Sequence, residues 1–131
     1  MVTEKLAKAY FWRSSTPPPK HHSGFVTFMR ALGSVPGAKQ QHLAATFEFK
    51  SFDILEAWIS RSLPLAYELE RLAVALAQDG PNPEYPWPHH APVENPARHR
   101  FAIWNRLTDT AQGRQLIRVI QLAVERFPTY A

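Results

Sequence analysis

The sequence predicts a mostly α fold with a small β-hairpin (α+β), in which one long central helix organises the other elements. Three observations predict it. Apolar residues recur with a helical period between Asp53 and Asp79, two further amphipathic segments follow near the C-terminus, and apolar and polar residues alternate within residues 43–52. At 131 residues, the chain (1–131) is expected to form a single compact domain with its own hydrophobic core.

The predicted central helix begins at Asp53, because Asp53 and Glu56 have the spacing of a capping box and their charge suits a helix start. Gly80 and Pro81 follow Asp79, and this pair is typical of a helix end. The apolar residues of the stretch have helical spacing and are predicted to face the core: Ile54, Leu55, Trp58, Ile59, Leu65, Leu69, Leu72 and Leu76.

Pro64 conflicts with a regular helix in the middle of this stretch. Proline has no backbone N–H to donate, and its ring clashes with the carbonyl one turn earlier. We therefore predict a kinked helix, with the kink or a break near residues 60–62, where Ser62 could cap a second helix. One bent helix and two short helices both fit the sequence.

The N-terminal segment is predicted to be a short helix followed by a linker. Residues 3–12 place apolar residues on one side, with Thr3 as the candidate cap, although the aromatic composition of residues 9–13 also suits a strand. Residues 14–22 contain three consecutive prolines, which favour an extended polyproline conformation over a regular element.

The sequence of residues 23–52 is compatible with two secondary structures. Residues 23–33 have apolar residues at helical spacing, but their composition also suits a strand. The alternating segment 43–52 is the best strand candidate in the chain, and it needs a partner strand, for which residues 25–32 are the nearest candidate. We therefore favour a two-stranded hairpin over an all-helical alternative with a helix through residues 40–47.

Two amphipathic helices are predicted at the C-terminus. Asn95 as cap and Pro96 at the first position mark the start of one helix. Asp109 and Gln112 mark the start of the other, which is expected to end at Phe127. Because the connection is short, both should pack antiparallel against the central helix. Their predicted inner faces are Phe101, Ile103, Trp104 and Leu107, and then Leu116, Ile117, Val119, Ile120, Ala123, Val124 and Phe127.

Arg100 falls within the apolar face of the first of these helices. A guanidinium in an apolar environment must be paired or must extend to solvent. We therefore predict an ion pair between Arg100 and Glu68 or Glu70 of the central helix.

Residues 80–95 are predicted to form a long loop, because their proline density leaves no room for a regular element. Loops of this length are often functional in compact domains. Aromatic side chains are common anchors of protein interfaces, so Tyr85 and Trp87 are the candidate contacts to a protein partner.

Composition excludes several classes of protein. An apolar fraction of 45% excludes wholesale disorder. No apolar run approaches the roughly 20 residues of a membrane span, so no membrane contact is expected. The absence of cysteine excludes disulfides and thiolate metal sites, and it agrees with a cytoplasmic location.

No motif in the sequence fixes a catalytic chemistry. It contains no G-x-S-x-G nucleophile motif, no glycine-rich phosphate loop and no histidine pair at H-x-x-x-H spacing. A metal-dependent hydrolase built on His89, His90 and His99 is the least favoured interpretation, because their spacing is a weak signal. We therefore favour a protein that is not an enzyme, and we expect neither a metal ion nor a cofactor.

The net charge of +4 is concentrated at the two ends of the chain, around an acidic middle. Either the ends pair with the central helix, or one end faces a polyanion. Arg98 shares a helix face with Arg106, as Arg114 does with Arg118, and arginine suits bidentate contact with phosphate. We therefore predict a non-enzymatic module whose basic C-terminal face binds nucleic acid, or a small subunit of a nucleoprotein assembly. The alternative is a protein–protein adaptor that uses the 80–95 loop.

Overall fold

The computed structural model describes residues 2–15, 17, 24–79 and 101–131, with only the backbone for residues 73–79. Within these ranges it contains seven helices and no strand. The helices are α1 (Val2–Arg13), α2 (Phe25–Leu32), α3 (Gly37–Thr46), α4 (Phe52–Asp79), α5 (Ile103–Asp109), α6 (Ala111–Glu125) and α7 (Phe127–Tyr130). The predicted mostly helical fold is thereby confirmed.

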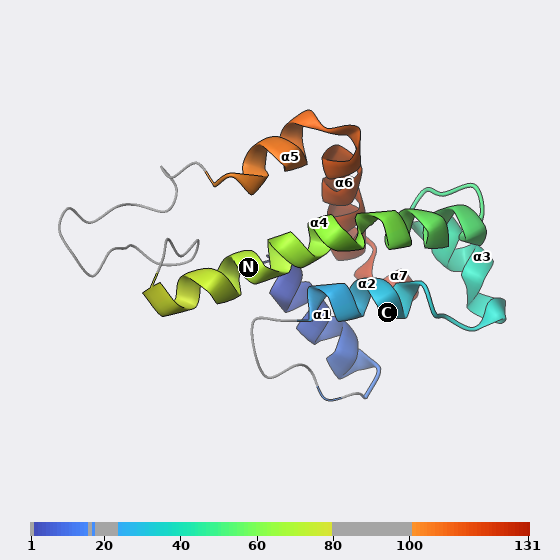
Figure 1. Ribbon diagram of the computed structural model, residues 1–131. Helices are drawn as coiled ribbons and strands as arrows, with labels where there is room; N and C mark the ends of the chain where they lie inside the picture. The colour runs from blue at the N-terminus through green and yellow to red at the C-terminus, as the bar shows by residue number, and fades with distance from the viewer. Residues whose placement is uncertain (1, 16, 18–23, 80–100) are drawn as a thin grey trace.

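Figure 1 shows α4 running across the middle of the molecule. α1 and α2 lie on one side of α4 and α5 on the other, α6 crosses α4, and α3 packs beside its N-terminal part. α7 packs on α3. Buried apolar residues from α1 to α6 form one hydrophobic cluster around α4, and its largest fully buried members include Phe25, Phe28, Phe47 and Leu55.

α4 is one continuous helix, although Pro64 lies inside it. It runs to Asp79, where the described range stops, and its predicted cap is wrong. The Ile54 N–H donates to Ser51 Oγ (3.4 Å), so Ser51 precedes the first turn and Asp53 lies within it. Ile54 is 47% exposed, contrary to prediction. Most of the described apolar face is confirmed, because buried side chains recur along it: Leu55, Trp58, Ile59, Leu65 and Ala66.

Of the two predicted alternatives, the structure has one helix and not two short ones, and a contact from α6 lies beside Pro64. Pro64 has no N–H for the carbonyl of Ser60, one turn earlier. Beside it, Gln112 of α6 donates its Nε2 to the carbonyl of Arg61 at 2.7 Å. α6 therefore supplies a hydrogen-bond donor to the turn of α4 in which Pro64 removes a backbone hydrogen bond.

The predicted β-hairpin over residues 23–52 is wrong, because residues 25–32 form α2 and residues 43–52 contain the end of α3, a turn and the start of α4. The alternating segment is interrupted at Glu48, whose φ of 65° lies in the left-handed region. The N–H groups of Glu48 and Phe49 donate to the carbonyls of Ala45 (3.1 Å) and Ala44 (2.8 Å), a Schellman motif that ends α3. In α2, all four apolar residues at helical spacing are buried: Phe25, Phe28, Met29 and Leu32.

α1 confirms the predicted N-terminal helix, but Thr3 is not its cap. Thr3 lies within the first turn of α1 and is buried. The helix buries Leu6 and Phe11. The ring of Tyr10 contacts that of Phe28 edge-on, with the centroids 5.2 Å apart. α1 is therefore part of the core.

The start of each C-terminal helix differs from the prediction. Phe101 and Ala102 precede α5, so the predicted helix does not run on from Asn95 and Pro96, which lie outside the described residues. The cap of α6 is Thr110, not Asp109: its Oγ1 accepts the N–H of Gly113 at 3.0 Å.

The predicted antiparallel packing on α4 is wrong for α6 (Figure 1). Thr110 alone joins α5 to α6, and Figure 1 shows the two helices forming a corner, with α6 crossing α4. The predicted inner face of α6 is confirmed at its centre, where Leu116, Val119 and Ala123 are buried. α6 ends at Glu125 and the separate short helix α7 follows.

Some predicted segments lie outside the described residues. The 80–95 loop lies wholly outside them, and the 14–22 linker does so except for Ser14, Ser15 and Pro17. None of the described helices combines the length and apolar character needed to cross a membrane.

Candidate functional site

The arginines predicted to contact phosphate are exposed where the structure describes them. Arg106 lies on α5, and Arg114 and Arg118 lie on α6, while Arg98 is outside the described residues. Each described guanidinium is hydrogen-bonded within the chain. Arg114, for example, donates its Nη1 to the carbonyl of Thr108 at 3.2 Å.

Arg106 connects α5 to the central helix. Its Nη1 donates to Glu68 Oε2 in an ion pair, and the hydrogen bond raises the pKa of the Arg106 guanidinium. Both side chains are about half exposed, so solvent weakens this attraction. Glu68 was one of two predicted partners of Arg100, which lies outside the described residues. Arg106 therefore pairs with the acidic central helix, as expected if the basic ends of the chain pair within the fold.

Glu48 joins the end of α3 to the C-terminal part of the chain. Arg118 Nη2 donates to both carboxylate oxygens of Glu48 (3.0 and 3.2 Å), and Arg126 Nη2 donates to Oε1 at 2.9 Å. Arg126 Nη1 also donates to the carbonyl of Thr46 at 2.6 Å. The hydrogen bond from Arg118, together with the charge of both arginines, lowers the pKa of the Glu48 carboxyl. These contacts hold Glu48 in the left-handed backbone conformation that non-glycine residues disfavour.

We expect Glu48→Gln to flatten the loss of stability in acid. The pKa of Glu48 is lower in the folded chain than its usual value of about 4.3. Its stabilisation is therefore present above that usual pKa and is lost as the pH falls through the folded value. Urea unfolding at a series of pH values should show wild type and variant converging in acid. Glu56→Gln, at an exposed residue of α4, is the control. Parallel curves for wild type and Glu48→Gln would contradict the ion-pair interpretation.

An open apolar groove lies where α1, α4, α5 and α6 meet. It has a volume of about 620 Å³. The polar residues in its lining are Thr3, Gln121 and Glu125. Its apolar lining comes from all four helices: Val2, Leu69, Trp104, Leu107, Ile117, Ile120 and Val124.

Three of these apolar side chains are unusually exposed. Val2 is 61% exposed, Trp104 is 56% exposed and Val124 is 50% exposed. Single exposed apolar residues are common, but a group that borders one concave surface marks a binding surface. The groove is therefore the best candidate binding site within the described residues.

The prediction that Trp104 faces the core is wrong, and so is that for Val124. In α5 the buried residues are Ile103 and Leu107, which lie one turn apart. Trp104 follows Ile103 directly, so its side chain points about 100° away around the helix. The apolar residues of α5 and α6 therefore form two adjacent faces, one in the core and one at the groove. The spacing of apolar residues does not distinguish these two faces.

The remaining predicted site residues lie mostly outside the described residues. Tyr85 and Trp87 do so, and so do the three histidines of the hydrolase interpretation. His42 is described, and its Nε2 is 3.0 Å from the carbonyl oxygen of Thr129. Among the described side chains, no three of His, Asp and Glu lie close enough together to hold a metal ion.

The chain was compared with protein-family models, with curated proteins and with solved structures, and none of them matches it.

Proposed function

We propose that the protein is a non-enzymatic docking module that binds an amphipathic helix of a partner protein in the groove between α1, α4, α5 and α6. The observation that carries this proposal is the groove's apolar lining with three exposed side chains at its surface. Tryptophan is enriched among the residues that dominate binding energy at protein interfaces, so Trp104 is the expected main contact.

The shape and the lining of the groove favour a helix as the ligand. An amphipathic helix inserts apolar residues spaced at i, i+3, i+4 and i+7 into an open hydrophobic groove. A volume of about 620 Å³ is large enough for several such side chains. The described polar residues of the lining are few, namely Thr3, Gln121 and Glu125, which suits a ligand whose backbone bonds are satisfied internally.

Glu125 specifies the charge of that helix. Among the described residues it is the one charged residue in the lining of the groove, and it makes no hydrogen bond or ion pair with any other of them. A lysine or arginine on the partner helix would therefore meet an unpaired carboxylate. We infer that the partner presents a basic residue beside its apolar face.

Two synthetic amphipathic peptides test this proposal. Both carry leucines at i, i+3, i+4 and i+7, one with lysines and one with glutamates on the polar face. Because the chain has a net charge of +4, non-specific attraction favours the glutamate peptide. We expect instead that the lysine peptide binds more tightly in NMR titrations, and that Glu125→Gln removes this preference.

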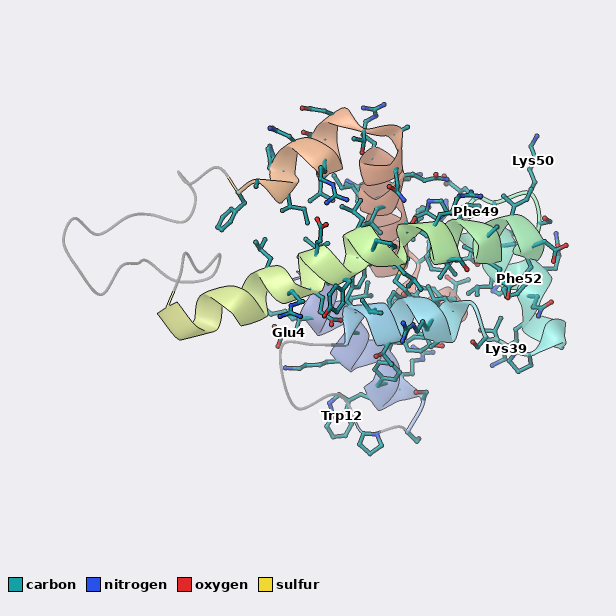
Figure 2. All side chains as sticks on the ribbon, viewed as in Figure 1. Glu4, Trp12, Lys39, Phe49, Lys50 and Phe52 are labelled. Carbon is teal, nitrogen blue, oxygen red and sulfur yellow. The ribbon has the colours of Figure 1, made fainter. Side chains whose placement is uncertain are left out.

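Trp104→Ala should weaken binding of the lysine peptide at least about tenfold, the effect of losing a central aromatic contact. The variant should fold normally, because the side chain is largely exposed. Trp12→Ala is the matched control: Trp12 is 71% exposed, and Figure 2 shows it at the C-terminal end of α1, far from α5 and α6. This control should leave binding unchanged.

Three outcomes would contradict a separate partner. The first is the absence of saturable binding by either peptide. The second is a dimer in sedimentation experiments that Trp104→Ala converts to monomer, which would make a second copy the occupant. The third is a set of nuclear Overhauser effects between Trp104 and residues 80–100, which would make that segment the occupant.

Binding of nucleic acid by the basic C-terminal face stays a prediction. A phosphate would have to compete with Glu68 for Arg106 and with Glu48 for Arg118. Both carboxylates are already in place, whereas the groove has no occupant among the described residues. We therefore place protein docking ahead of nucleic-acid binding.

A further inference from the structure

The apolar groove has two different ends, because it follows α6 across α4. The residues of α6 that line it share one helix face, from Ile117 to Glu125. α6 begins beside α5, where Gly113 lies against Leu107, and it crosses α4 toward the side on which α1 lies (Figure 1). The groove therefore runs from α5 at one end to α1 at the other.

The described polar residues of the lining are at the α1 end. Gln121 and Glu125 are one turn apart in the last part of α6, and Thr3 belongs to the first turn of α1. The α5 end contributes the apolar side chains of Trp104 and Leu107. Threonine and glutamine side chains both donate and accept hydrogen bonds, whereas a carboxylate only accepts them. The α1 end of the groove therefore offers mainly acceptors.

The two ends of a bound helix differ in the same respect. The first four N–H groups of a helix have no acceptor within it, and the last four carbonyls have no donor. The helix start also carries about half a positive charge, and its end about half a negative charge. A helix that starts at Glu125 brings free N–H groups to a carboxylate, whereas the opposite direction brings free carbonyls to it. The groove therefore distinguishes the two directions.

Two helices of the protein also terminate at the α1 end, and their dipoles oppose each other. α6 ends at Glu125 with about half a negative charge, and α1 begins at Val2 with about half a positive charge. Glu4, in the first turn of α1, is paired with Lys8 at 2.6 Å. These charges largely cancel, so the full charge of the exposed Glu125 carboxylate decides the sign at this end. It favours the start of a bound helix.

The same fold already contains such a contact between two helices. Glu70 of α4 accepts the N–H groups of Gly24 and Val26 at 3.0 and 2.9 Å, at the start of α2. Gly24 has no side chain with which to cap that helix. A carboxylate on one helix therefore caps the start of its neighbour in this structure.

We propose that the partner helix lies antiparallel to α6, with its first turn against Glu125 and its last turn against Trp104. This direction rests on the proposed function, because it requires a helix in the groove. The stretch from Ile117 to Glu125 is about 12 Å long at about 1.5 Å per residue, so about two turns of the partner fit along it. A carboxylate has two oxygens, so Glu125 can accept from the first turn and from a basic side chain one turn further on.

Spin labels on the two ends of the lysine peptide measure its direction. The chain contains no cysteine, so a nitroxide attached to a single cysteine of the peptide is the one label in the complex. Acetyl and amide groups remove the terminal charges of the peptide. A label at the N-terminus of the peptide should broaden the NMR signals of Thr3 and Glu125 more strongly than those of Trp104 and Leu107. A label at its C-terminus should do the reverse.

An aspartate placed at either end of the peptide gives a second test at equal net charge. The helix dipole stabilises a helix with aspartate at its start and destabilises one with aspartate at its end. The expected order of affinity is the opposite, because an aspartate at the start would face Glu125. That peptide should bind at least about threefold more weakly. Glu125→Gln should remove the difference, and Glu56→Gln, at an exposed residue of α4, should keep it.

Failure of this direction and failure of the proposed function give different results. Reversed broadening, or equal broadening of both ends by each label at saturation, would overturn the antiparallel direction while the groove still binds a helix. Tighter binding of the peptide with aspartate at its start would overturn it as well. Absence of saturable binding by the lysine peptide would instead contradict the proposed function, and the direction with it.

Discussion

Gly113→Ala is expected to lower the free energy of unfolding by about 3 kcal/mol, at the upper end of what overpacking usually costs. Gly113 lies in the first turn of α6 and is buried against the end of α5. A Cβ atom there would lie 2.5 Å from Leu107 Cα and 2.7 Å from the Leu107 carbonyl oxygen, and closer still to the carbonyl oxygen of Arg106. These are backbone atoms of a helix, so no side-chain rotation can relieve the overlap.

The sign of this effect makes it a strong test of the corner between α5 and α6. Glycine to alanine inside a helix normally stabilises it by about 0.5–1 kcal/mol. Gly37→Ala is the control, because Gly37 opens α3 and a Cβ there would meet no atom within 4 Å. Urea unfolding followed by circular dichroism should show Gly37→Ala unchanged or slightly stabilised. If Gly113→Ala behaved in the same way, the close approach of α6 to α5 would be wrong.

The corner also connects the fold to the proposed docking site. Leu107 packs against Gly113 and also lines the apolar groove. Ile117 and Ile120 of α6 line the same groove. Moving α6 away from α5 would therefore widen the groove. We expect the lysine peptide to bind Gly113→Ala more weakly than Trp12→Ala.

Helices whose apolar residues repeat over several turns could be predicted from the sequence. The stripe in α4 and the inner face of α6 are examples, because many residues report the same period. The segment around Phe47 was wrongly predicted to be a strand. It is short, and its alternating apolar residues contact different helices from a turn. Phe47 packs on Tyr130 and Phe49 packs on Trp58, on either side of a left-handed Glu48.

The capping residues of α4 and α6 were predicted one or two residues away from the observed ones. Ser51 caps α4 where Asp53 was expected, and Thr110 caps α6 where Asp109 was expected. Several capping residues stand together at each site, and local spacing cannot choose among them. The choice depends on where tertiary packing fixes the first turn.

Contacts between distant residues were beyond the reach of sequence patterns. Arg118 and Glu48 are 70 positions apart, and nothing local marks them as partners. The groove has the same origin, because α1, α4, α5 and α6 each supply a few of its residues. A periodic pattern assigns a residue to a helix face but does not say which faces remain uncovered.

Glu70 gives the second large effect: Glu70→Ala should lower the free energy of unfolding by about 2 kcal/mol, as expected for hydrogen bonds to a charged group. Its Oε2 accepts the backbone N–H groups of Gly24 (3.0 Å) and Val26 (2.9 Å), which lie at the start of α2. Gly24 precedes α2 and has no side chain with which to cap it. The carboxylate of α4 therefore acts as the cap of α2 from 46 residues away.

The loss is expected to exceed that of an ordinary surface carboxylate for two reasons. Of the two donors, Gly24 is buried and Val26 is half-buried, so water cannot readily replace the lost acceptor. The negative charge also lies at the positive end of the α2 dipole. Glu70→Gln keeps an oxygen acceptor without the charge, so it should lose about half as much.

Glu56→Ala is the matched control, since Glu56 is an exposed glutamate of the same helix. It should change stability by less than about 0.5 kcal/mol. Hydrogen exchange gives the local measurement, because the amides of Gly24 and Val26 should lose protection in Glu70→Ala and keep it in Glu56→Ala. α2 carries Phe28 and Met29 into the centre of the core, so a loosened start of α2 should reduce the cooperativity of unfolding as well. Equal stability of the Glu70→Ala and Glu56→Ala variants would show that α2 is held by its apolar face alone.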